Sequence, residues 1–283
     1  MNPSWRITIL MNNYVRASGL EAEHGLALAL ENVGDGSLIL LDTGGTREAM
    51  LRNAEKLGVD WSRLSTIVLS HGHHDHTGGL LPLIRRLSHS VALLHHPDAF
   101  LPKAGIRPAF HPIGAGMGPS DLPPDKATLF PAANDVRLAP DLWVTGEIPR
   151  KVEVDREAAA GFYTSRGGRL EEDPVRDDKS IVIEKPGLGY YLVCGCCHSG
   201  LINTIRYVKE RVPDKKLLGV LGGLHLIGAS EARMDATLEE LTKEAPGLLG
   251  PIHCSGLRET ARIYKALGPE VVAFYSVGDR VEL

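Results

Sequence analysis

Short apolar runs separated by polar turns recur along the N-terminal part of the chain. These runs predict strands at 5–10, 25–31, 37–41, 66–69 and 91–94. Two stretches between the strands place apolar residues at helical spacing and predict helices at 46–57 and 80–87. This alternation of strands and helices is typical of an α/β protein.

The C-terminal half repeats the same rhythm after a change of character in the middle of the chain. Strands are predicted at 180–184, 190–194, 217–221, 248–252 and 271–276, and helices at 201–210, 231–244 and 257–267. The stretch from about 101 to 180 is crowded first with prolines and glycines and then with charges, and only 135–144 suggests hairpin strands. We therefore expect one domain over 1–283 with a loop-rich insertion at about 101–180. Two strand-rich halves with their own helices predict a four-layer αββα sandwich of two mixed sheets.

The densest group of metal-ligating residues follows the strand predicted at 66–69. It is the run His71-Gly72-His73-His74-Asp75-His76. His71 and His73 are two residues apart, so an extended segment projects both imidazoles to one side. Asp75 and His76 precede the helix predicted at 80–87, whose first turn faces the same point. Imidazole and carboxylate at a strand-to-helix junction favour a two-metal site for zinc, iron or manganese.

Three more histidines each follow a predicted strand. His198 lies in Gly195-Cys196-Cys197-His198-Ser199-Gly200, His225 ends Gly222-Gly223-Leu224-His225, and His253 opens His253-Cys254-Ser255-Gly256. Strand ends are where ligands and catalytic groups collect in α/β proteins. These histidines are therefore predicted to join the same site.

Composition and charge narrow the function further. The chain has 283 residues, 43% of them hydrophobic, with a formal charge of −4, which disfavours nucleic-acid binding. It has no apolar run of membrane-spanning length, and its first residues lack the plan of a secretion signal, so we expect a cytoplasmic protein. The four cysteines are expected to be reduced thiols, with a zinc knot of Cys194, Cys196, Cys197 and Cys254 as an alternative.

The sequence resembles the metallo-β-lactamase-fold hydrolases. Their motif H-x-H-x-D-H is matched by His71, His73, Asp75 and His76. Their aspartate in a strand-end turn is matched by Asp42 in Leu41-Asp42-Thr43-Gly44, and their late histidine by His253. The resemblance spans nearly the whole chain and implies the four-layer αββα fold.

A narrower resemblance is to the subgroup that is similar to 7,8-dihydropterin-6-yl-methyl-4-(β-D-ribofuranosyl)aminobenzene 5'-phosphate synthase. It rests on Glu23-His24-Gly25-Leu26, Ser70-His71-Gly72-His73, Gly195-Cys196-Cys197-His198-Ser199-Gly200 and His253-Cys254-Ser255-Gly256. Some members act in the synthesis of methanopterin-type cofactors, and many are unassigned. The subgroup therefore says little about the substrate.

Two family features have no counterpart in this chain. There is no Pro-Gly-His turn, and Gly195-Cys196-Cys197-His198 stands where a Gly-Asp turn would supply a bridging aspartate. His198 is the favoured replacement ligand, and Cys196 remains an alternative. Occupancy of the second metal position is open because the bridging carboxylate is missing.

The resemblance implies a role for each candidate residue. One divalent metal ion, zinc before iron or manganese, would be held by His71, His73 and His198, and a second by Asp75, His76 and His253. A metal-bound hydroxide would be the nucleophile and Asp75 would orient it.

The remaining candidates surround those ligands. His225 is the expected general acid or oxyanion donor. Asp42 is expected to accept a ring N–H from a ligand histidine or to serve only as a turn residue, and His24 to line the site.

The leading hypothesis is a metal-dependent hydrolase acting on a small anionic phosphate- or ester-type substrate. A synthase-like transferase that forms a C–N bond with loss of diphosphate is the first alternative. A metal-stabilised binding protein without turnover is the second. The sequence predicts neither a nucleic-acid nor a membrane partner, and it leaves the oligomeric state open.

Overall fold

The computed structural model describes residues 4–46 and 48–283, which form two compact units. Of the described residues, unit 1 comprises 4–46, 48–132, 163–171 and 276–283, and unit 2 comprises 133–162 and 172–275. Outside the described residues lie Met1 to Pro3 and Arg47. The first three belong to the segment considered as a secretion signal, and Arg47 belongs to the predicted helix 46–57. The described helices include none that is long and apolar enough to cross a membrane.

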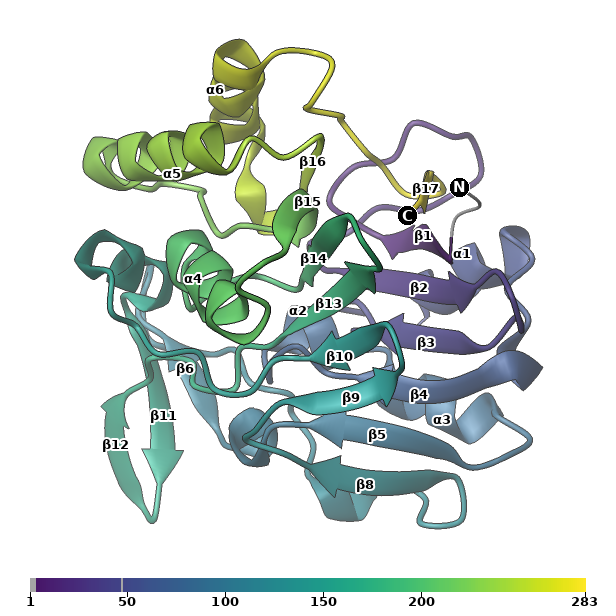
Figure 1. Cartoon of the computed structure of the whole chain (residues 1–283). Coiled ribbons are helices and arrows are strands. Elements are labelled where there is room, and N and C mark those ends of the chain that lie inside the picture. Colours follow the sequence, from purple (N-terminus) through teal and green to yellow (C-terminus); the bar gives the residue numbers. More distant parts are fainter. Residues whose placement is uncertain (1–3, 47) are drawn as a thin grey trace. The chain divides into compact units, whose positions relative to one another are not determined.

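The larger sheet of unit 1 has seven strands in the order β17-β1-β2-β3-β4-β5-β8 (Figure 1). Their bounds are β1 Trp5–Met11, β2 Ala27–Asn32, β3 Leu38–Leu41, β4 Leu64–Val68, β5 Val91–His95, β8 Ala127–Pro131 and β17 Arg280–Glu282. Pairing is antiparallel from β17 to β3 and parallel from β3 to β8. The carboxyl ends of β3 and β4 therefore meet at one edge, where the histidine run begins.

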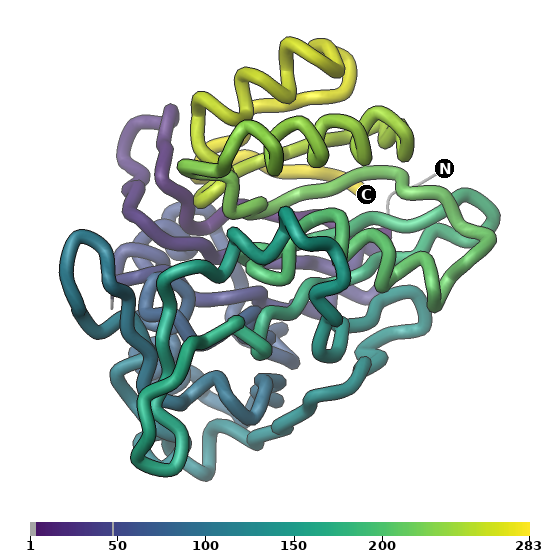
Figure 2. The backbone as a smooth tube through the Cα atoms, turned by 90° about the vertical axis from the view of Figure 1, so that its left-hand side faces the viewer, coloured from purple at the N-terminus to yellow at the C-terminus, as the bar shows by residue number. Residues whose placement is uncertain are grey.

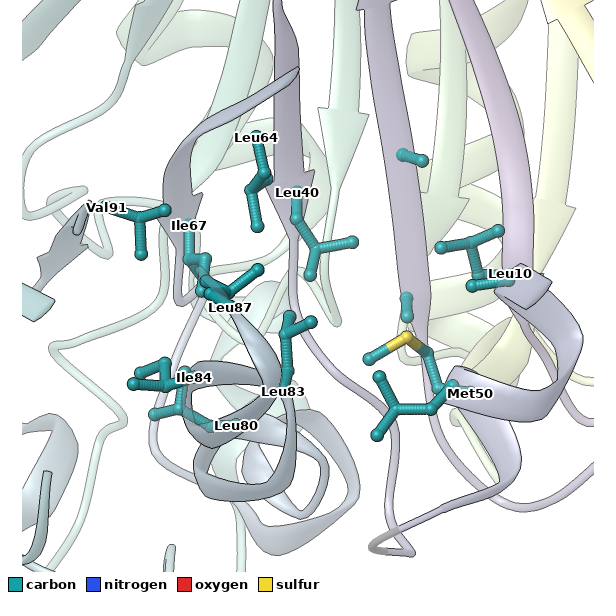
Figure 3. Close-up of a cluster of buried hydrophobic side chains, with 14 of the residues drawn as sticks. Leu10, Leu40, Met50, Leu64, Ile67, Leu80, Leu83, Ile84, Leu87 and Val91 are labelled. Atoms are coloured by element: carbon teal, nitrogen blue, oxygen red, sulfur yellow. The ribbon is translucent and has the colours of Figure 1, made fainter. Parts of the chain in front are cut away.

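Two helices cover one face of this sheet, and their apolar sides build the core of unit 1. They are α1 Ala49–Lys56 and α3 Leu80–Arg86, and the one-turn helix α2 His74–Thr77 precedes α3. Met50 of α1 and Leu83 of α3 are fully buried among strand residues such as Leu40 and Ile67 (Figure 3). The helical spacing of the apolar residues thus places one face of each helix on the sheet.

A smaller sheet, formed mainly by residues of unit 1, has the strand order β12-β11-β6-β7. Its strands are β6 Lys103–Gly105, β7 His111–Pro112, β11 Phe162–Arg166 and β12 Arg169–Glu172. Short 3-10 turns η1 Trp61–Arg63, η2 Pro97–Phe100 and η3 Pro119–Asp121 connect elements of this unit.

Unit 2 is built on a six-stranded sheet in the order β16-β15-β14-β13-β10-β9. The strands are β9 Val136–Ala139, β10 Leu142–Val144, β13 Ser180–Lys185, β14 Gly189–Cys194, β15 Lys216–Gly223 and β16 Leu248–Ile252. β14, β15 and β16 run parallel, and the remaining pairs are antiparallel. This sheet also presents three parallel strand ends side by side (Figure 1).

The helices of unit 2 are α4 Leu201–Arg211, α5 Glu231–Glu244 and α6 Leu257–Leu267, with the 3-10 turns η4 Glu153–Ala159 and η5 His253–Ser255. Helices α5 and α6 lie next to each other, as the backbone trace also shows (Figure 2), and Arg262 pairs with Glu231 between them. Ser230 caps α5 by accepting a hydrogen bond from the backbone N–H of Arg233.

Most predicted elements are present within a few residues of the expected bounds, but one strand is wrong. Residues 271–276 form no strand: Val272 makes a single bridge to Leu249, and the chain then continues to β17, which pairs with β1. The stretch from about 101 to 180 contains strands β6 to β12, and β8, β9 and β10 extend the two larger sheets.

Candidate functional site

In unit 1 the candidate residues gather where β3 and β4 end. Asp42 follows β3 directly, and its φ of 59° is a left-handed conformation that a non-glycine residue rarely adopts. Such strain costs about 1–3 kcal/mol and is found mostly where surrounding structure fixes a functional geometry. Ser70 and His71 follow β4, and α2 carries Asp75 and His76.

Asp42 is a buried carboxylate that joins both ends of the histidine run. Its Oδ1 accepts the backbone N–H of Ser70 at 2.7 Å, and its Oδ2 accepts the Ser70 hydroxyl at 2.6 Å. The same Oδ2 lies 2.6 Å from Nδ1 of His76. The expected hydrogen bond from Asp42 to a histidine of the motif is therefore present, and it fixes one ring of the run.

These contacts determine which nitrogen of each ring carries a proton. The single hydroxyl hydrogen of Ser70 goes to Asp42, so the 2.9 Å contact between Ser70 Oγ and His71 Nδ1 needs the hydrogen on Nδ1. An ionised Asp42 likewise needs the hydrogen on Nδ1 of His76. Both imidazoles then present the lone pair of Nε2, the form in which histidine binds a metal ion.

His71 and His73 meet edge to face with their ring centroids 4.4 Å apart. Nε2 of His71 lies 3.0 Å from Nδ1 of His73. Two nitrogens bound to one zinc ion at about 2.0–2.1 Å and a tetrahedral angle would be about 3.3 Å apart. The observed separation needs only a small adjustment, so this pair fits the expected metal.

Asp75 lies beside two imidazoles, and the exposed one, His24, can donate to it. Its Oδ2 lies 3.5 Å from Nε2 of His76 and 3.3 Å from Nε2 of His24. The amide Nδ2 of Asn13 lies 3.2 Å from Nδ1 of His24, and donation there leaves the Nε2 hydrogen to point at Asp75. His24 therefore does more than line the site, because it holds the carboxylate of the motif.

The backbone of the motif has no room for a side chain between the first two histidines. A Cβ on Gly72 would lie 1.9 Å from the carbonyl oxygen of Ala99. A Cβ on Gly78, just after α2, would lie 2.0 Å from the carbonyl oxygen of Gly45. Close approach of backbone to backbone thus explains glycine at both positions.

In unit 2 three strand ends carry residues in the left-handed region. Cys197 after β14 has φ 60°, His225 after β15 has φ 46°, and His253 after β16 has φ 52°. All three strands are parallel neighbours, so their ends lie along one edge of the sheet. Strain at successive strand ends marks this edge as the candidate site of unit 2.

His198 is held in the same tautomer as the histidines of unit 1. Its Nδ1 lies 2.7 Å from the carbonyl oxygen of Ala158, which can only accept, so Nδ1 carries the hydrogen and Nε2 the lone pair. The ring of Phe162 packs edge-on against His198 at 5.3 Å, and the His225 ring lies 4.2 Å from it. His198 therefore has the orientation expected of a ligand.

The sulfur atoms of unit 2 divide into two separate contacts. Cys254 Sγ lies 3.3 Å from Cys196 Sγ and receives the backbone N–H of His225, also at 3.3 Å. Cys197 Sγ lies 3.4 Å from the hydroxyl of Thr204, and a hydrogen bond with the neighbouring Cys194 thiol, together with burial, raises the pKa of Cys197 well above its ordinary value. The cysteines are free thiols, as expected, and this arrangement does not favour the four-cysteine zinc knot.

Each unit thus brings its own share of the predicted residues together. Unit 1 gathers Asp42, His24, His71, His73, Asp75 and His76, and unit 2 gathers Cys196, His198, His225 and His253 at the ends of β14, β15 and β16. Sequence reasoning gave no role to Ser70 or to the carbonyl of Ala158, although both fix a ring. Ser70 stands directly before His71, so its position in the motif was the available signal.

Comparison with known proteins identifies the family of this arrangement. A model of the metallo-beta-lactamase superfamily matches residues 22–170, a range that holds the whole histidine run. The chain belongs to the metallo-beta-lactamase superfamily. This membership confirms the predicted α/β class and the predicted fold. The fold is shared by a crystal structure of Tm1679, which is described as a metal-dependent hydrolase of the beta-lactamase superfamily. That structure has a TM-score of 0.82 at 23% identity, with 99% of each chain covered.

Two superfamily relatives from Methanocaldococcus jannaschii are similar over most of the chain. One is named 7,8-dihydropterin-6-methyl-4-(beta-D-ribofuranosyl)-aminobenzene-5'-phosphate synthase and is 30% identical over 247 residues, which cover 84% of this chain and 82% of the relative. The other, the uncharacterized protein MJ0448, is 31% identical over 247 residues, which cover 86% of this chain and 88% of the relative. The predicted resemblance to the synthase subgroup is confirmed.

Proposed function

We propose that this protein is a metal-dependent hydrolase of a small phosphate- or ester-type molecule. The observation that carries the proposal is the hydrogen-bond pattern around Asp42, which leaves the Nε2 lone pairs of His71 and His76 available beside Asp75. Neutral imidazoles with fixed tautomers and an ionised carboxylate are the donors that zinc, iron and manganese take. His71, His73, Asp75 and His76 would hold metal in unit 1, and His198 and His253 remain the predicted further ligands.

The bound metal would supply Lewis acidity, which lowers the pKa of a coordinated water from 15.7 to about 7 and polarises a phosphoryl or carbonyl oxygen. The protein's own residues would do the rest. Asp75, held by His24, would orient the attacking water and accept its proton, while Asp42 keeps the His76 and His71 rings in place.

A second candidate function is supported by the name of one relative. In a synthase-like transfer, an aromatic amine nitrogen attacks a methylene carbon that carries diphosphate: the C–N bond forms, the C–O bond breaks, and diphosphate leaves as the amine proton passes to Asp75. The two relatives from one organism are nearly equally similar to this chain, and only one is named a synthase. Identity at this level therefore supports the subgroup without choosing the reaction, and hydrolysis stays first.

The proposal is tested by metal content together with turnover. Protein purified without added metal and then offered zinc, iron or manganese should bind metal and hydrolyse chromogenic phosphodiester, phosphomonoester or ester substrates. Replacing Asp75 and His76 together by alanine should abolish the activity and release metal from unit 1. Binding below about a tenth of an equivalent for all three metals would end the proposal.

The choice between the two reactions needs one more measurement. The protein is incubated with a dihydropterin methyl diphosphate and an aminobenzene ribofuranosyl phosphate, and the products are separated by mass. A product in which the two parts are joined through nitrogen establishes transfer. Release of phosphate or diphosphate with no joined product establishes hydrolysis.

A further inference from the structure

Three neighbouring parallel strands of unit 2 each deliver a metal-binding side chain at the same distance beyond their end. Cys196 lies two residues after β14, His225 two residues after β15, and Cys254 two residues after β16. The register pairs Cys194 with Gly222 and Gly223 with Ile252, so the three ends are level to within one residue. Equivalent positions on adjacent strands converge at the sheet edge, where ligand sites form in α/β proteins.

The ligand atoms of these residues form a tight cluster. The Sγ atoms of Cys196 and Cys254 are 3.3 Å apart, and they lie with a ring nitrogen of His225 all within 4.8 Å of one another. Both thiols are buried. Nδ1 of His225 is buried and has no hydrogen-bond partner among residues 4–46 and 48–283. A bound ion would give this buried ring nitrogen the partner that buried polar atoms normally have.

The surroundings are built to keep this cluster in place. A Cβ on Gly223 would lie 2.7 Å from Cys254 Sγ, so glycine there leaves the space that the sulfur occupies. The buried guanidinium of Arg233 donates to the carbonyl oxygen of His225 at 2.7 Å and fixes the strained loop. The backbone N–H of His225 points at Cys254 Sγ, as N–H groups do around the sulfur ligands of metal ions.

We propose that Cys196, Cys254 and His225 bind a zinc ion of their own. Two sulfurs bound to one zinc at about 2.3 Å and a tetrahedral angle would be about 3.8 Å apart, so the pair needs to open by only about half an ångström. Two thiolates, a neutral imidazole and a divalent ion carry no net charge. Such a cluster therefore suits a buried place where an isolated charge would not.

The site has consequences for two residues with other expected roles. It assigns Cys196 to a thiolate site, so that this residue no longer competes with His198 as a ligand of the catalytic metal. It also gives His225 a ligand role in place of the general-acid role expected from the sequence. The ion would also connect the ends of β14, β15 and β16. Its ligand Cys196 lies two residues before His198, and its ligand Cys254 lies one residue after His253.

The test uses cobalt as a spectroscopic substitute for zinc in the full-length protein. The reduced protein is stripped with a chelator and titrated with Co²⁺ while the near-ultraviolet thiolate-to-cobalt charge-transfer band is recorded. The wild type should show the band, and Cys254→Ser should lose most of it together with about one equivalent of metal per chain. Cys194→Ser, which changes another buried cysteine at the end of β14, is the matched control and should keep both.

A second variant separates this site from the proposed catalytic centre. His71→Ala should lose metal from unit 1 and keep the charge-transfer band, so the two proposals can fail independently. Loss of the band in His71→Ala, or an unchanged band in Cys254→Ser, would overturn the thiolate site. If Cys254→Ser does not fold, X-ray absorption at the zinc edge of the wild type decides: sulfur neighbours at about 2.3 Å in the averaged zinc shell support the site, and a shell of only nitrogen and oxygen neighbours rejects it.

Discussion

Replacing Asp42 by asparagine tests the hydrogen-bond pattern on which the proposed metal site depends. Asparagine keeps the shape and one acceptor oxygen, which can still take the backbone N–H of Ser70. Its amide nitrogen then stands where Oδ2 accepts both the Ser70 hydroxyl and His76 Nδ1. Because an amide nitrogen only donates, the hydrogen of His76 must move to Nε2, and the lone pair meant for the metal is lost.

The size of the effect follows from these contacts. Loss of the partner that orients a metal-binding histidine usually lowers metal affinity 10- to 100-fold, which corresponds to about 1.4–2.7 kcal/mol of binding free energy. The change in a buried donor and acceptor costs about 1–3 kcal/mol of folding stability in addition. Asp42 serves both His71, through Ser70, and His76, so we expect the upper part of the affinity range.

The assay is calorimetric titration of the metal-free protein with zinc, and the control is Asp60→Asn. Asp60 also accepts a backbone N–H and a hydroxyl, both from Ser62, but it is exposed and holds no histidine. A folded Asp42→Asn protein with a dissociation constant within about twofold of the wild type would refute the reasoning. Ser70→Ala, which frees only His71, should show a smaller loss and serves if Asp42→Asn does not fold.

Two further changes test the buried charge of unit 2 and the packing of the motif. Burial lowers the pKa of Lys179 from 10.5 to about 8, against the raising effect of nearby carboxylates, so the native state releases this proton before the unfolded chain does. Between pH 8 and 10.5 the unfolded chain binds more protons than the native state, so the free energy of unfolding rises with pH. In urea titrations across this window, the free energy of unfolding of the wild type should rise by up to about 3 kcal/mol relative to that of Lys179→Met. A difference between the two proteins that stays constant with pH would contradict the lowered pKa. Gly72→Ala should lower the free energy of unfolding by about 1–3 kcal/mol and weaken metal binding, because its Cβ would meet the Ala99 carbonyl. Gly118→Ala, whose Cβ would lie 3.9 Å from its nearest neighbours, is the control, and equal stability of both variants would refute the packing argument.

Elements with a long periodic pattern could be predicted from the sequence, and those held by distant pairing could not. Helices α5 and α6 and strand β16 have the predicted bounds, because apolar spacing and end signals agree along each of them. Residues 271–276 are apolar enough for a strand, but their only ladder contact among the described residues is one bridge between Val272 and Leu249. Strand β17 has three residues, too few to show any period, and exists because β1 pairs with it.

The same distinction applies to the candidate site. The order of His71, His73, Asp75 and His76 is local, so their grouping followed from spacing at a strand-to-helix junction. The partner of His76 is Asp42, 34 positions earlier in the chain. In the sequence alone, an aspartate at that place is explained equally well as a turn residue, and only the 2.6 Å contact distinguishes the two roles. The acceptor for His198 is a backbone carbonyl 40 positions away, for which side-chain identity gives no signal at all.

The acceptors behind the rings also order the histidines by their strength as ligands. Nδ1 of His76 is bonded to a carboxylate, Nδ1 of His71 to a hydroxyl that itself donates to that carboxylate, and Nδ1 of His198 to a peptide carbonyl. An ionised acceptor raises the basicity of the opposite nitrogen most, a hydroxyl polarised by the same charge raises it less, and a neutral carbonyl least. His76 should therefore be the strongest donor of the three. The buried Asp42 carboxylate contacts His76 directly and His71 through Ser70, so it supplies both the orientation of the rings and the negative charge that a dication requires. This explains why Asp42 is kept in a strained conformation at the end of β3.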